Sequence, residues 1–453
     1  MSIADWYRQY SEGLAALSRM LWDHPEASEK EYISSKLLKQ YLVSHGFEIL
    51  EDGAAGLETA FVASRGNGRP YIGFLAEYDA LPGLSQQCVP SPSPVSGQEY
   101  GHGCGHNLLG TGAVGAAVAT ACAMEEASVP GTVFLFGCPS EEVMLGKIVM
   151  AKNHIFDDLD AAISWHPGDR NRASEESYQA MLSVEYHFHG KASHAAMAPD
   201  QGLSALDAVE LMDVGVNYLR EHVPAGVQIH YVILNGGDKP NIVPDKAAVW
   251  QFVRAATTAD LHKVAARMDD VAAGAAKMTG TTYTKKVLTG CNETRIVPAL
   301  VEVMNQVMDE IPGPEWSEEE EQYAREILDH LGRTREETEA AFGEGTYEHP
   351  LHAGHLKPTG RTIDILGSSD LSDVSYIVPT CMLFAACYPY GTPNHSWAVT
   401  ACTGMSIGQK GMLYASRVMA ETGFRLITDG ELLDRVKASF RKALGTSVYE
   451  PVQ

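Results

Sequence analysis

The chain has 453 residues, of which 45% are hydrophobic and 20% are charged. This length is too great for one hydrophobic core, so two domains are expected. The formal net charge of −24 argues against nucleic acid and anionic membrane surfaces as partners. The N-terminal sequence shows no signal peptide, and the most apolar run, residues 113–124, is too short to span a bilayer. Eight scattered cysteines favour a reducing cytoplasm.

The first third of the chain alternates helical and strand patterns. Apolar residues at helical spacing predict helices over residues 5–23 and 29–45, and apolar runs predict strands over residues 59–63 and 71–76. The second strand ends in a turn that contains Asp79. Open α/β sheets place functional sites at the carboxyl ends of strands. Asp79 is therefore a candidate site residue, and an ordinary turn aspartate is the alternative.

The sequence GHGCGHN at residues 101–107 places Cys104 and His106, both metal-ligand types, one residue apart. Its three glycines allow a tight loop that aims both side chains at one point. An apolar helix follows up to Met124, so the loop lies at a helix N-terminus, which favours a thiolate or an anionic substrate. A buried structural cysteine beside ordinary histidines explains this loop alone equally well.

Two further apolar strands end in candidate site residues. Residues 132–138 are followed by Glu141 and Glu142, and such a pair can divide its work, with one carboxylate ligating a metal and the other acting as general base on water. A solvated pair is the alternative. Residues 159–165 lead into His166, either a metal ligand or a satisfied loop histidine.

From about residue 184 the pattern changes to that of an inserted domain. The strands and helices follow the order βαββαβ of the ferredoxin-like split fold, over residues 184–190, 203–222, 227–234, 248–255, 259–278 and 281–289. Three polar residues of this insert, His194, Asn241 and Arg254, are candidates for function, and each can also be structural.

After about residue 293 the α/β pattern returns. The sequence predicts a helix over residues 297–310, a charged helical segment over 315–345, a polar loop over 367–373 and an apolar strand over 381–388. Two closing helices are predicted over residues 403–421 and 430–443. His395 follows the apolar strand and again lies beyond a predicted strand end. The domains are therefore expected to be a catalytic domain in two parts, residues 1–183 and 293–453, around the insert, residues 184–292.

Five potential ligands lie in turns or at predicted strand ends, namely Cys104, His106, Glu142, His166 and His395. This number exceeds the four ligands of a closed structural zinc site. Two metal ions that share a bridging ligand and keep open positions for water and substrate are expected instead.

Together the motifs HGCGHN, PSEE, WHP, SHAA, NIVPD, GSSD and NHSW resemble the aminoacylase/carboxypeptidase family of co-catalytic metallopeptidases. The resemblance covers nearly the whole chain and is strongest to the amidohydrolase branch, which contains aminobenzoyl-glutamate hydrolase and the hydrolases of indole-acetyl-amino acids. It implies an α/β catalytic domain with a mainly parallel sheet flanked by helices. It also implies that the insert is a ferredoxin-like α+β lid and dimerisation domain of a homodimer.

The resemblance also implies residue roles. Glu141 would be the general base, and Asp79 would support the site without binding metal. His194 would reach a neighbouring subunit's site and stabilise the oxyanion, while Asn241 and Arg254 would hold the substrate's carboxylate. The chain departs from other branches at Glu77, where they carry a histidine.

The expected function is metal-dependent cleavage of the amide bond of an N-acyl amino acid, with an aryl or aryl-acyl group, such as aminobenzoyl-glutamate. The cofactors would be two divalent ions per subunit, Mn²⁺ or Zn²⁺, because thiolate and imidazole favour zinc while carboxylates also accept manganese. The alternatives are a dipeptidase or aminoacylase acting on β-alanyl or acyl amino acids, a non-catalytic small-molecule binding protein that contains metal, and a structural zinc protein.

Overall fold

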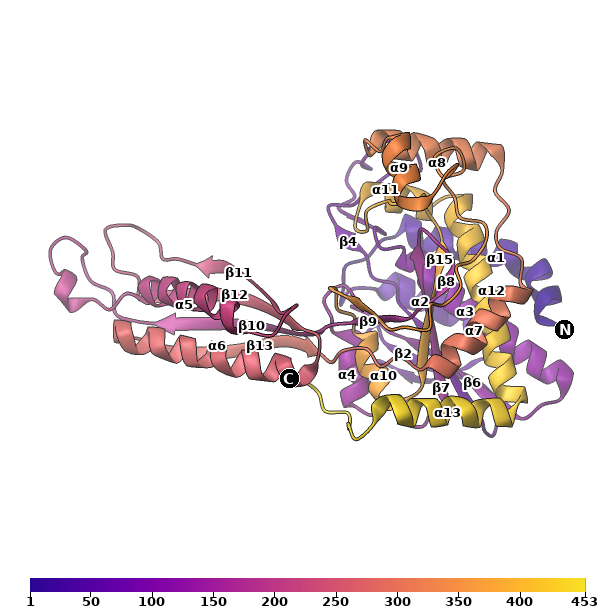
Figure 1. Cartoon of the computed structure of the whole chain (residues 1–453), viewed down its shortest axis with the longest axis horizontal. Helices are drawn as coiled ribbons and strands as arrows, with labels where there is room; N and C mark the ends of the chain where they lie inside the picture. The colour runs from indigo at the N-terminus through magenta and orange to yellow at the C-terminus, as the bar shows by residue number, and fades with distance from the viewer. Residues whose placement is uncertain (453) are drawn as a thin grey trace. The chain divides into compact units, whose positions relative to one another are not determined.

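The computed structural model describes residues 1–452 and divides into two compact units (Figure 1). The first unit contains residues 1–175, 295–362 and 374–448. The second contains residues 176–294 and 363–373 and, of the described chain, residues 449–452. The second unit therefore contains the expected insert and two additional short segments from the C-terminal third of the chain.

The first unit is built on a sheet of seven strands. In spatial order the strands are β1 (Glu48–Asp52), β2 (Phe61–Asn67), β6 (Gly131–Gly137), β3 (Tyr71–Ala76), β7 (Ala161–Gly168), β15 (Thr380–Ala386) and β8 (Arg172–Ala173). The four central strands from β6 to β15 are parallel, and the strands outside them pair antiparallel. Two short strands, β4 (Leu81–Pro82) and β5 (Tyr100–Gly101), form a separate ribbon.

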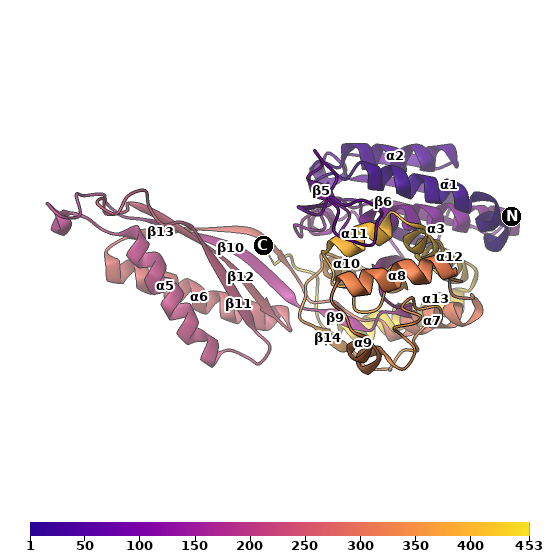
Figure 2. The same ribbon diagram turned by 90° about the horizontal axis from the view of Figure 1, so that it is seen from above.

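Helices surround this sheet, as Figures 1 and 2 show. They are α1 (Ile3–Asp23), α2 (Tyr32–Ser44), α3 (His106–Ala127), α4 (Gly146–Lys152), α7 (Pro298–Glu310), α8 (Glu318–His330), α9 (Arg335–Phe342), α11 (Trp397–Thr403), α12 (Ser406–Thr428) and α13 (Gly430–Leu444), while α10 (Leu371–Ile377) begins in the second unit and ends in the first. Helices α3 and α12 pack against each other and against the central strands.

Helix α3 is long and apolar enough to cross a membrane, yet 94% of its apolar window is buried inside the protein. A helix that is apolar on all sides needs to be covered on all sides, and here the covering includes α1, α12 and strand β3. Its first residue, His106, is completely buried. The helix thus serves as the core of the first unit and carries the cysteine loop at its N-terminus.

The second unit has a four-stranded antiparallel sheet in the order β11 (Gln228–Asn235), β12 (Lys246–Ala255), β10 (Ala180–His189) and β13 (Thr282–Cys291). Helices α5 (Ala205–Leu219) and α6 (Thr258–Thr279) pack together on one face of it. Because alternate side chains of a strand point to opposite faces, Val249 and Val253 enter this core while Arg254 lies on the other face. A short parallel pair, β9 (Glu176–Tyr178) with β14 (Ile363–Ile365), completes the unit.

The expected fold class is confirmed: a parallel-centred α/β sheet with helices, plus a ferredoxin-like α+β unit. One local expectation was wrong, and one strand was not predicted. His166 was expected beyond a strand but lies inside β7, because that strand continues to Gly168. Strand β1 was not predicted, since its burial is slight and its sequence, EILED, gives no apolar alternation on which to recognise it.

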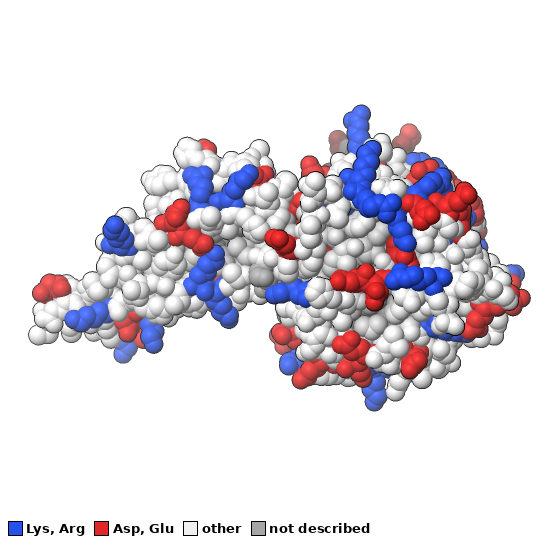
Figure 3. Space-filling view, turned by 90° about the horizontal axis from the view of Figure 1, so that it is seen from below, with Lys and Arg blue, Asp and Glu red and all other residues white. Residues whose placement is uncertain are grey.

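On the face in Figure 3, Lys and Arg side chains are interspersed with those of Asp and Glu. Ion pairs of the chain include Arg325 with Glu318 at 2.8 Å and Lys263 with Asp260 at 2.9 Å. On this face, the excess negative charge is therefore spread among basic side chains and does not form a patch of one sign.

Candidate metal centre and active site

The carboxyl ends of the central parallel strands carry the candidate groups of the first unit. Glu77 and Asp79 follow β3, Glu141 and Glu142 follow β6, and His395 follows β15. His166 lies near the end of β7, and the loop before α3 supplies Cys104 and His106. Parallel strands end at one edge of a sheet, so residues far apart in sequence meet there.

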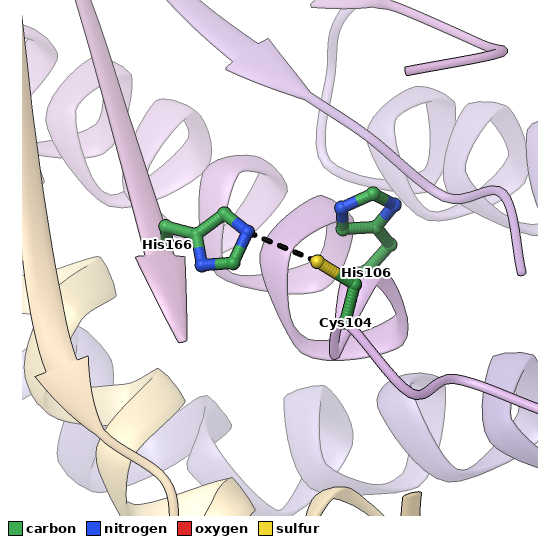
Figure 4. Close-up of side chains that lie close together, drawn as sticks. All are labelled: Cys104, His106 and His166. Atoms are coloured by element: carbon green, nitrogen blue, oxygen red, sulfur yellow. Dashed lines mark hydrogen bonds between the residues drawn. The ribbon is translucent and has the colours of Figure 1, made fainter. Parts of the chain in front are cut away.

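Two groups of ligand atoms meet at Cys104. The first consists of Cys104, His106 and His166, and the second of Cys104, Glu142 and His395. Within each group the ligand atoms lie within 4.8 Å of one another. The Sγ atom of Cys104 is 3.3 Å from Nε2 of His166, and a dashed line joins these two side chains in Figure 4. Cys104 is thus the one side chain that both groups share.

Hydrogen bonds orient the two imidazoles, one of them (His106) fully buried, toward this cysteine. Nδ1 of His106 donates to Oδ1 of Asp79 at 2.9 Å, and Nδ1 of His166 donates to the carbonyl oxygen of Pro167 at 2.7 Å. In a neutral imidazole, a ring nitrogen that donates leaves the other nitrogen with its lone pair, and this is the form that binds a metal. Each Nε2 is therefore available as a metal ligand, held by the kind of outer partner that metal-binding histidines use.

Burial raises the pKa of Asp79, but the hydrogen bond from His106 and its charge outweigh that effect and bring the pKa to about 2. The carboxylate also accepts from Ser28 Oγ at 2.8 Å and from the backbone N–H of Glu142 at 3.0 Å. Asp79 is ionised at neutral pH and has its oxygens engaged. This arrangement suits an orienting residue better than a metal ligand.

The side chains present fit a pair of divalent cations. Within residues 1–452, neither Nε2 of His106 nor Oε1 of Glu142 has a hydrogen-bond partner, although both atoms are buried. Burial also raises the pKa of the Cys104 thiol and that of the Glu142 carboxyl. A cation between them would stabilise the anionic forms and satisfy the unpaired atoms. The sulfur, nitrogen and oxygen donors suit zinc, and the carboxylate and imidazole donors also accept manganese.

The turn that carries Glu141 and Glu142 is fixed by a residue that the sequence analysis missed. Ser140, in this turn, has a left-handed φ of 61°. The completely buried carboxylate of Glu31 accepts a hydrogen bond from the backbone N–H of Ser140 at 2.9 Å and another from Thr59 Oγ1 at 2.7 Å. Asp79 holds the next part of the turn through Glu142. Glu31 stands one residue before an ordinary amphipathic helix, so nothing in its local sequence identifies this role.

Glu141 belongs to a third group of possible ligands, with Glu77 and His106, whose ligand atoms also lie within 4.8 Å of one another. Its carboxylate is thus placed beside the same histidine as the first group. A second missed residue is Lys147 on α4, which is completely buried and pairs with Glu77 at 2.7 Å. The sequence does contain a sign of this role, because Lys147 is a charged residue next to the apolar run that begins at Ile148.

The remaining candidates lie in the second unit, where the structure brings two of the three together. His194 and Ile242 form an isolated bridge, and the N–H of Ala195 donates to the carbonyl oxygen of Asn241 at 3.0 Å. Arg254, in contrast, lies on β12, eight residues from Lys246. Lys246 is the end of that strand nearest to the loops that carry His194 and Asn241. At about 3.3 Å per residue the eight residues span roughly 26 Å. Within one copy of the second unit, Arg254 therefore lies far from His194 and Asn241.

Comparison with known proteins agrees with this architecture. The family model of the peptidase dimerisation domain matches residues 179–280. Over 448 residues the chain is 37% identical to one of the subunits of p-aminobenzoyl-glutamate hydrolase of Escherichia coli, with 96% of this chain and 93% of that relative covered. The chain belongs to the M20 family of metallopeptidases and amidohydrolases.

Other similarities of this M20 hydrolase extend over most of its length. It is 28% identical to the Xaa-Arg dipeptidase of Mus musculus, over 95% of this chain and 89% of the relative. Its fold matches that of a dinuclear metal-binding peptidase from the M20 family of Bacillus subtilis, with a TM-score of 0.56, 17% identity, and 92% of this chain and 99% of the other covered. The likeness to the solved structure shows the shared fold.

Proposed function

We propose that this M20 hydrolase cleaves the amide bond of N-acyl amino acids with an aromatic acyl group, with p-aminobenzoyl-glutamate as the first candidate substrate. The observation that carries the proposal is the pair of ligand groups that share Cys104. The 37% identity to a relative named for that reaction, across 96% of the chain, supports the substrate class.

Two divalent ions, Mn²⁺ or Zn²⁺, would be held by Cys104, His106, Glu142, His166 and His395, and when bound they supply Lewis acidity and a water of lowered pKa. Glu141 would accept the proton of the attacking water and return it to the leaving nitrogen. Its neighbour Glu142 belongs to a ligand group that contains Cys104 and His395, which supports a division of work between the two carboxylates. General base catalysis of this kind contributes roughly 10²–10⁴-fold.

His194 would donate a hydrogen bond to the oxygen that gains negative charge when water attacks. Its Nδ1 accepts from the backbone N–H groups of Ala196 and Met197, each at 3.2 Å, so the proton resides on Nε2. The residue is exposed, and this N–H is therefore available to a ligand. One such donor is worth on the order of 10²–10³-fold in rate.

Arg254 and Asn241 would bind the carboxylate of the substrate. Arg254 is half-buried, and its Nε has no hydrogen-bond partner within residues 1–452. Burial lowers the pKa of this guanidinium, as expected for a cation held away from water. A carboxylate ligand would supply the missing bidentate partner.

We infer that two copies of the chain assemble through the second unit, as a homodimer. Strand β11 forms an edge of its sheet, and four consecutive apolar residues on it are exposed: Tyr231 37%, Val232 51%, Ile233 43% and Leu234 47%. An exposed apolar edge is a template for pairing with another chain. The separation between His194 and Arg254 in one unit supports the idea that a substrate meets groups of both copies.

Mixing two inactive variants tests this assembly. In a mixture of His194→Ala and Glu141→Ala chains, a mixed dimer contains one site with an intact Glu141 and a partner's intact histidine, so activity returns. Light scattering on the same sample should give twice the chain mass. A monomer with full activity would contradict the proposal. A requirement for a different chain would replace it with an assembly of two unlike subunits, the arrangement that the naming of the Escherichia coli relatives indicates for their enzyme.

A dipeptidase is the second candidate, because the chain is 28% identical to the Xaa-Arg dipeptidase over 95% of its length. The same metal core would serve both reactions. A hydrolysis panel on metal-depleted protein restored with Mn²⁺ or Zn²⁺ separates them, using p-aminobenzoyl-glutamate, indole-acetyl-aspartate, N-acetyl amino acids, β-alanyl dipeptides and an arginine dipeptide. Metal-dependent turnover of the aryl amides supports the proposal. Silence across the panel with two metals bound would contradict it and favour a binding protein.

We also propose a cytoplasmic location. None of the eight cysteines in the described part of the chain forms a disulfide, and six of them are buried. Free thiols persist in a reducing compartment.

A further inference from the structure

A buried ion pair lies beside the metal-ligand groups and takes no part in the mechanism above. Lys147 is completely buried on α4, and its Nζ is 2.7 Å from Oε1 of Glu77, whose side chain is 6% exposed. Removing both charges from water is costly, and a buried pair is often no more stable than an apolar replacement. The free energy of folding alone therefore gives little reason to keep this ion pair in the interior.

The second oxygen of Glu77 faces the metal-ligand atoms. Oε2 is 3.3 Å from Nε2 of His106. Asp79 accepts the proton of Nδ1 on the same ring, so in the neutral imidazole Nε2 carries a lone pair. Two acceptor atoms then face each other in a buried place, and they repel unless a proton or a metal cation lies between them.

The separation of these two atoms fits a shared ion. Nitrogen and oxygen ligands bind zinc at about 2.0–2.2 Å, so two of them around one tetrahedral ion stand roughly 3.4 Å apart. The pair Glu142 Oε2 and His395 Nε2 shows a similar separation of 3.4 Å. His106 Nε2 is fully buried and lacks a hydrogen-bond partner among residues 1–452, and Glu77, His106 and Glu141 form a ligand group within 4.8 Å.

We propose that Glu77 is a further ligand of the metal ion held by His106, and that Lys147 fixes the position and the negative charge of its carboxylate. The inference rests on the two-metal site of the proposed function and adds an oxygen donor to it. Nζ of Lys147 holds Oε1 of Glu77 at 2.7 Å, so Oε2, on the other side of the carboxylate, stays directed at Nε2 of His106. Lys147 acts as a positioning residue.

Metal binding by four proteins tests the proposal: the wild type, Glu77→Gln, Lys147→Met and the double variant Glu77→Gln/Lys147→Met. Lys152→Met, an exposed lysine on the same helix, is the matched control. Metal content after dialysis, dissociation constants from chelator competition, and the visible spectrum of the Co²⁺-substituted protein are read without reference to activity. The double variant keeps the pair neutral, so it remains informative if Lys147→Met alone fails to fold.

In Glu77→Gln the dissociation constant of one of the two ions rises at least about tenfold, and the ligand-field bands of one Co²⁺ change. The double variant regains the melting temperature lost in Lys147→Met but keeps the weakened site. The inference is overturned if Glu77→Gln binds two ions with wild-type constants and spectrum, or if the double variant regains wild-type affinity. A wild type that binds no metal would overturn the proposed function as well, and so the two failures are distinguishable.

Discussion

The carboxylate of Asp79 joins His106 to the backbone of Glu142. Its Oδ1 accepts from Nδ1 of His106 at 2.9 Å, and its Oδ2 accepts from the N–H of Glu142 at 3.0 Å. One buried residue therefore sets both the orientation of an imidazole at the start of α3 and the course of the turn after β6. The two ligand groups that share Cys104 depend on this connection.

Asp79→Asn should weaken metal binding by about 10–100-fold, the usual cost of losing an outer partner of a metal-binding histidine. The amide cannot accept with both atoms, so either His106 or Glu142 loses its hydrogen bond. Chelator competition measures the change. Ser28→Ala is the control, because it removes one donor to the same carboxylate and keeps its charge. Equal affinities in Asp79→Asn and wild type would contradict an orienting role.

Cys104→Ser should release both ions rather than one, because Cys104 is the side chain common to both ligand groups. A serine hydroxyl is a neutral, harder donor and replaces a thiolate poorly. Elemental analysis after dialysis should fall from two ions per chain to below one. Cys387→Ala, a buried cysteine outside the three ligand groups, should keep both ions. Retention of one tightly held ion in Cys104→Ser would show that the cysteine serves a single metal.

Glu31→Gln should destabilise the protein by about 1–3 kcal/mol, because the amide group faces donors where the carboxylate accepted. The backbone N–H of Ser140 and the hydroxyl of Thr59 would compete for one acceptor oxygen. Denaturant unfolding measures the loss, and activity should fall because the turn carrying Glu141 is no longer fixed. Glu29→Gln changes an exposed neighbour and should leave both properties unchanged. A similar effect of the two substitutions would refute this account.

The free energy of unfolding of the second unit should decrease as pH rises from about 4 to about 7. Burial raises the pKa of Asp213 to about 7, against about 3.9 in an unfolded chain. The folded state therefore keeps a proton that the unfolded state releases, so rising pH favours unfolding across that window. Asp213→Asn should remove this part of the pH dependence and raise the melting temperature near pH 7.5 relative to wild type.

The comparison of melting temperatures at pH 5 and pH 7.5 checks this, with Glu210→Gln on the same helix as the control for an exposed carboxylate. Within the described chain, Oδ2 of Asp213 and Oε1 of Gln251 both lack partners, so a proton on Asp213 has a nearby acceptor. Identical pH dependence in Asp213→Asn and wild type would contradict the prediction.

Local patterns predicted much of this structure. The apolar periodicity of the insert predicted its βαββαβ order, and the GHGCGHN loop was correctly placed before a buried helix. The ends of strands β3, β6 and β15 were predicted within a few residues, which placed Asp79, Glu141 and His395 at one edge of the sheet. The individual roles of these residues stay predictions.

Long-range polar contacts could not be predicted in the same way. Glu31 and Ser140 are 109 residues apart, and Glu77 meets Lys147 across 70 positions. Each pair depends on the spatial order of strands, which apolar periodicity does not determine. The exact end of β7 was also missed, because the sequence HPG after Trp165 resembles a turn although its backbone remains in the sheet.

The central claim is metal-dependent amide hydrolysis with Glu141 as general base. The most direct measurement compares the turnover of p-aminobenzoyl-glutamate by wild type and Glu141→Gln at equal, measured metal content. The account predicts two ions in both proteins and a rate at least about 10²-fold lower in the variant. Turnover near the wild-type rate in fully loaded Glu141→Gln would contradict it.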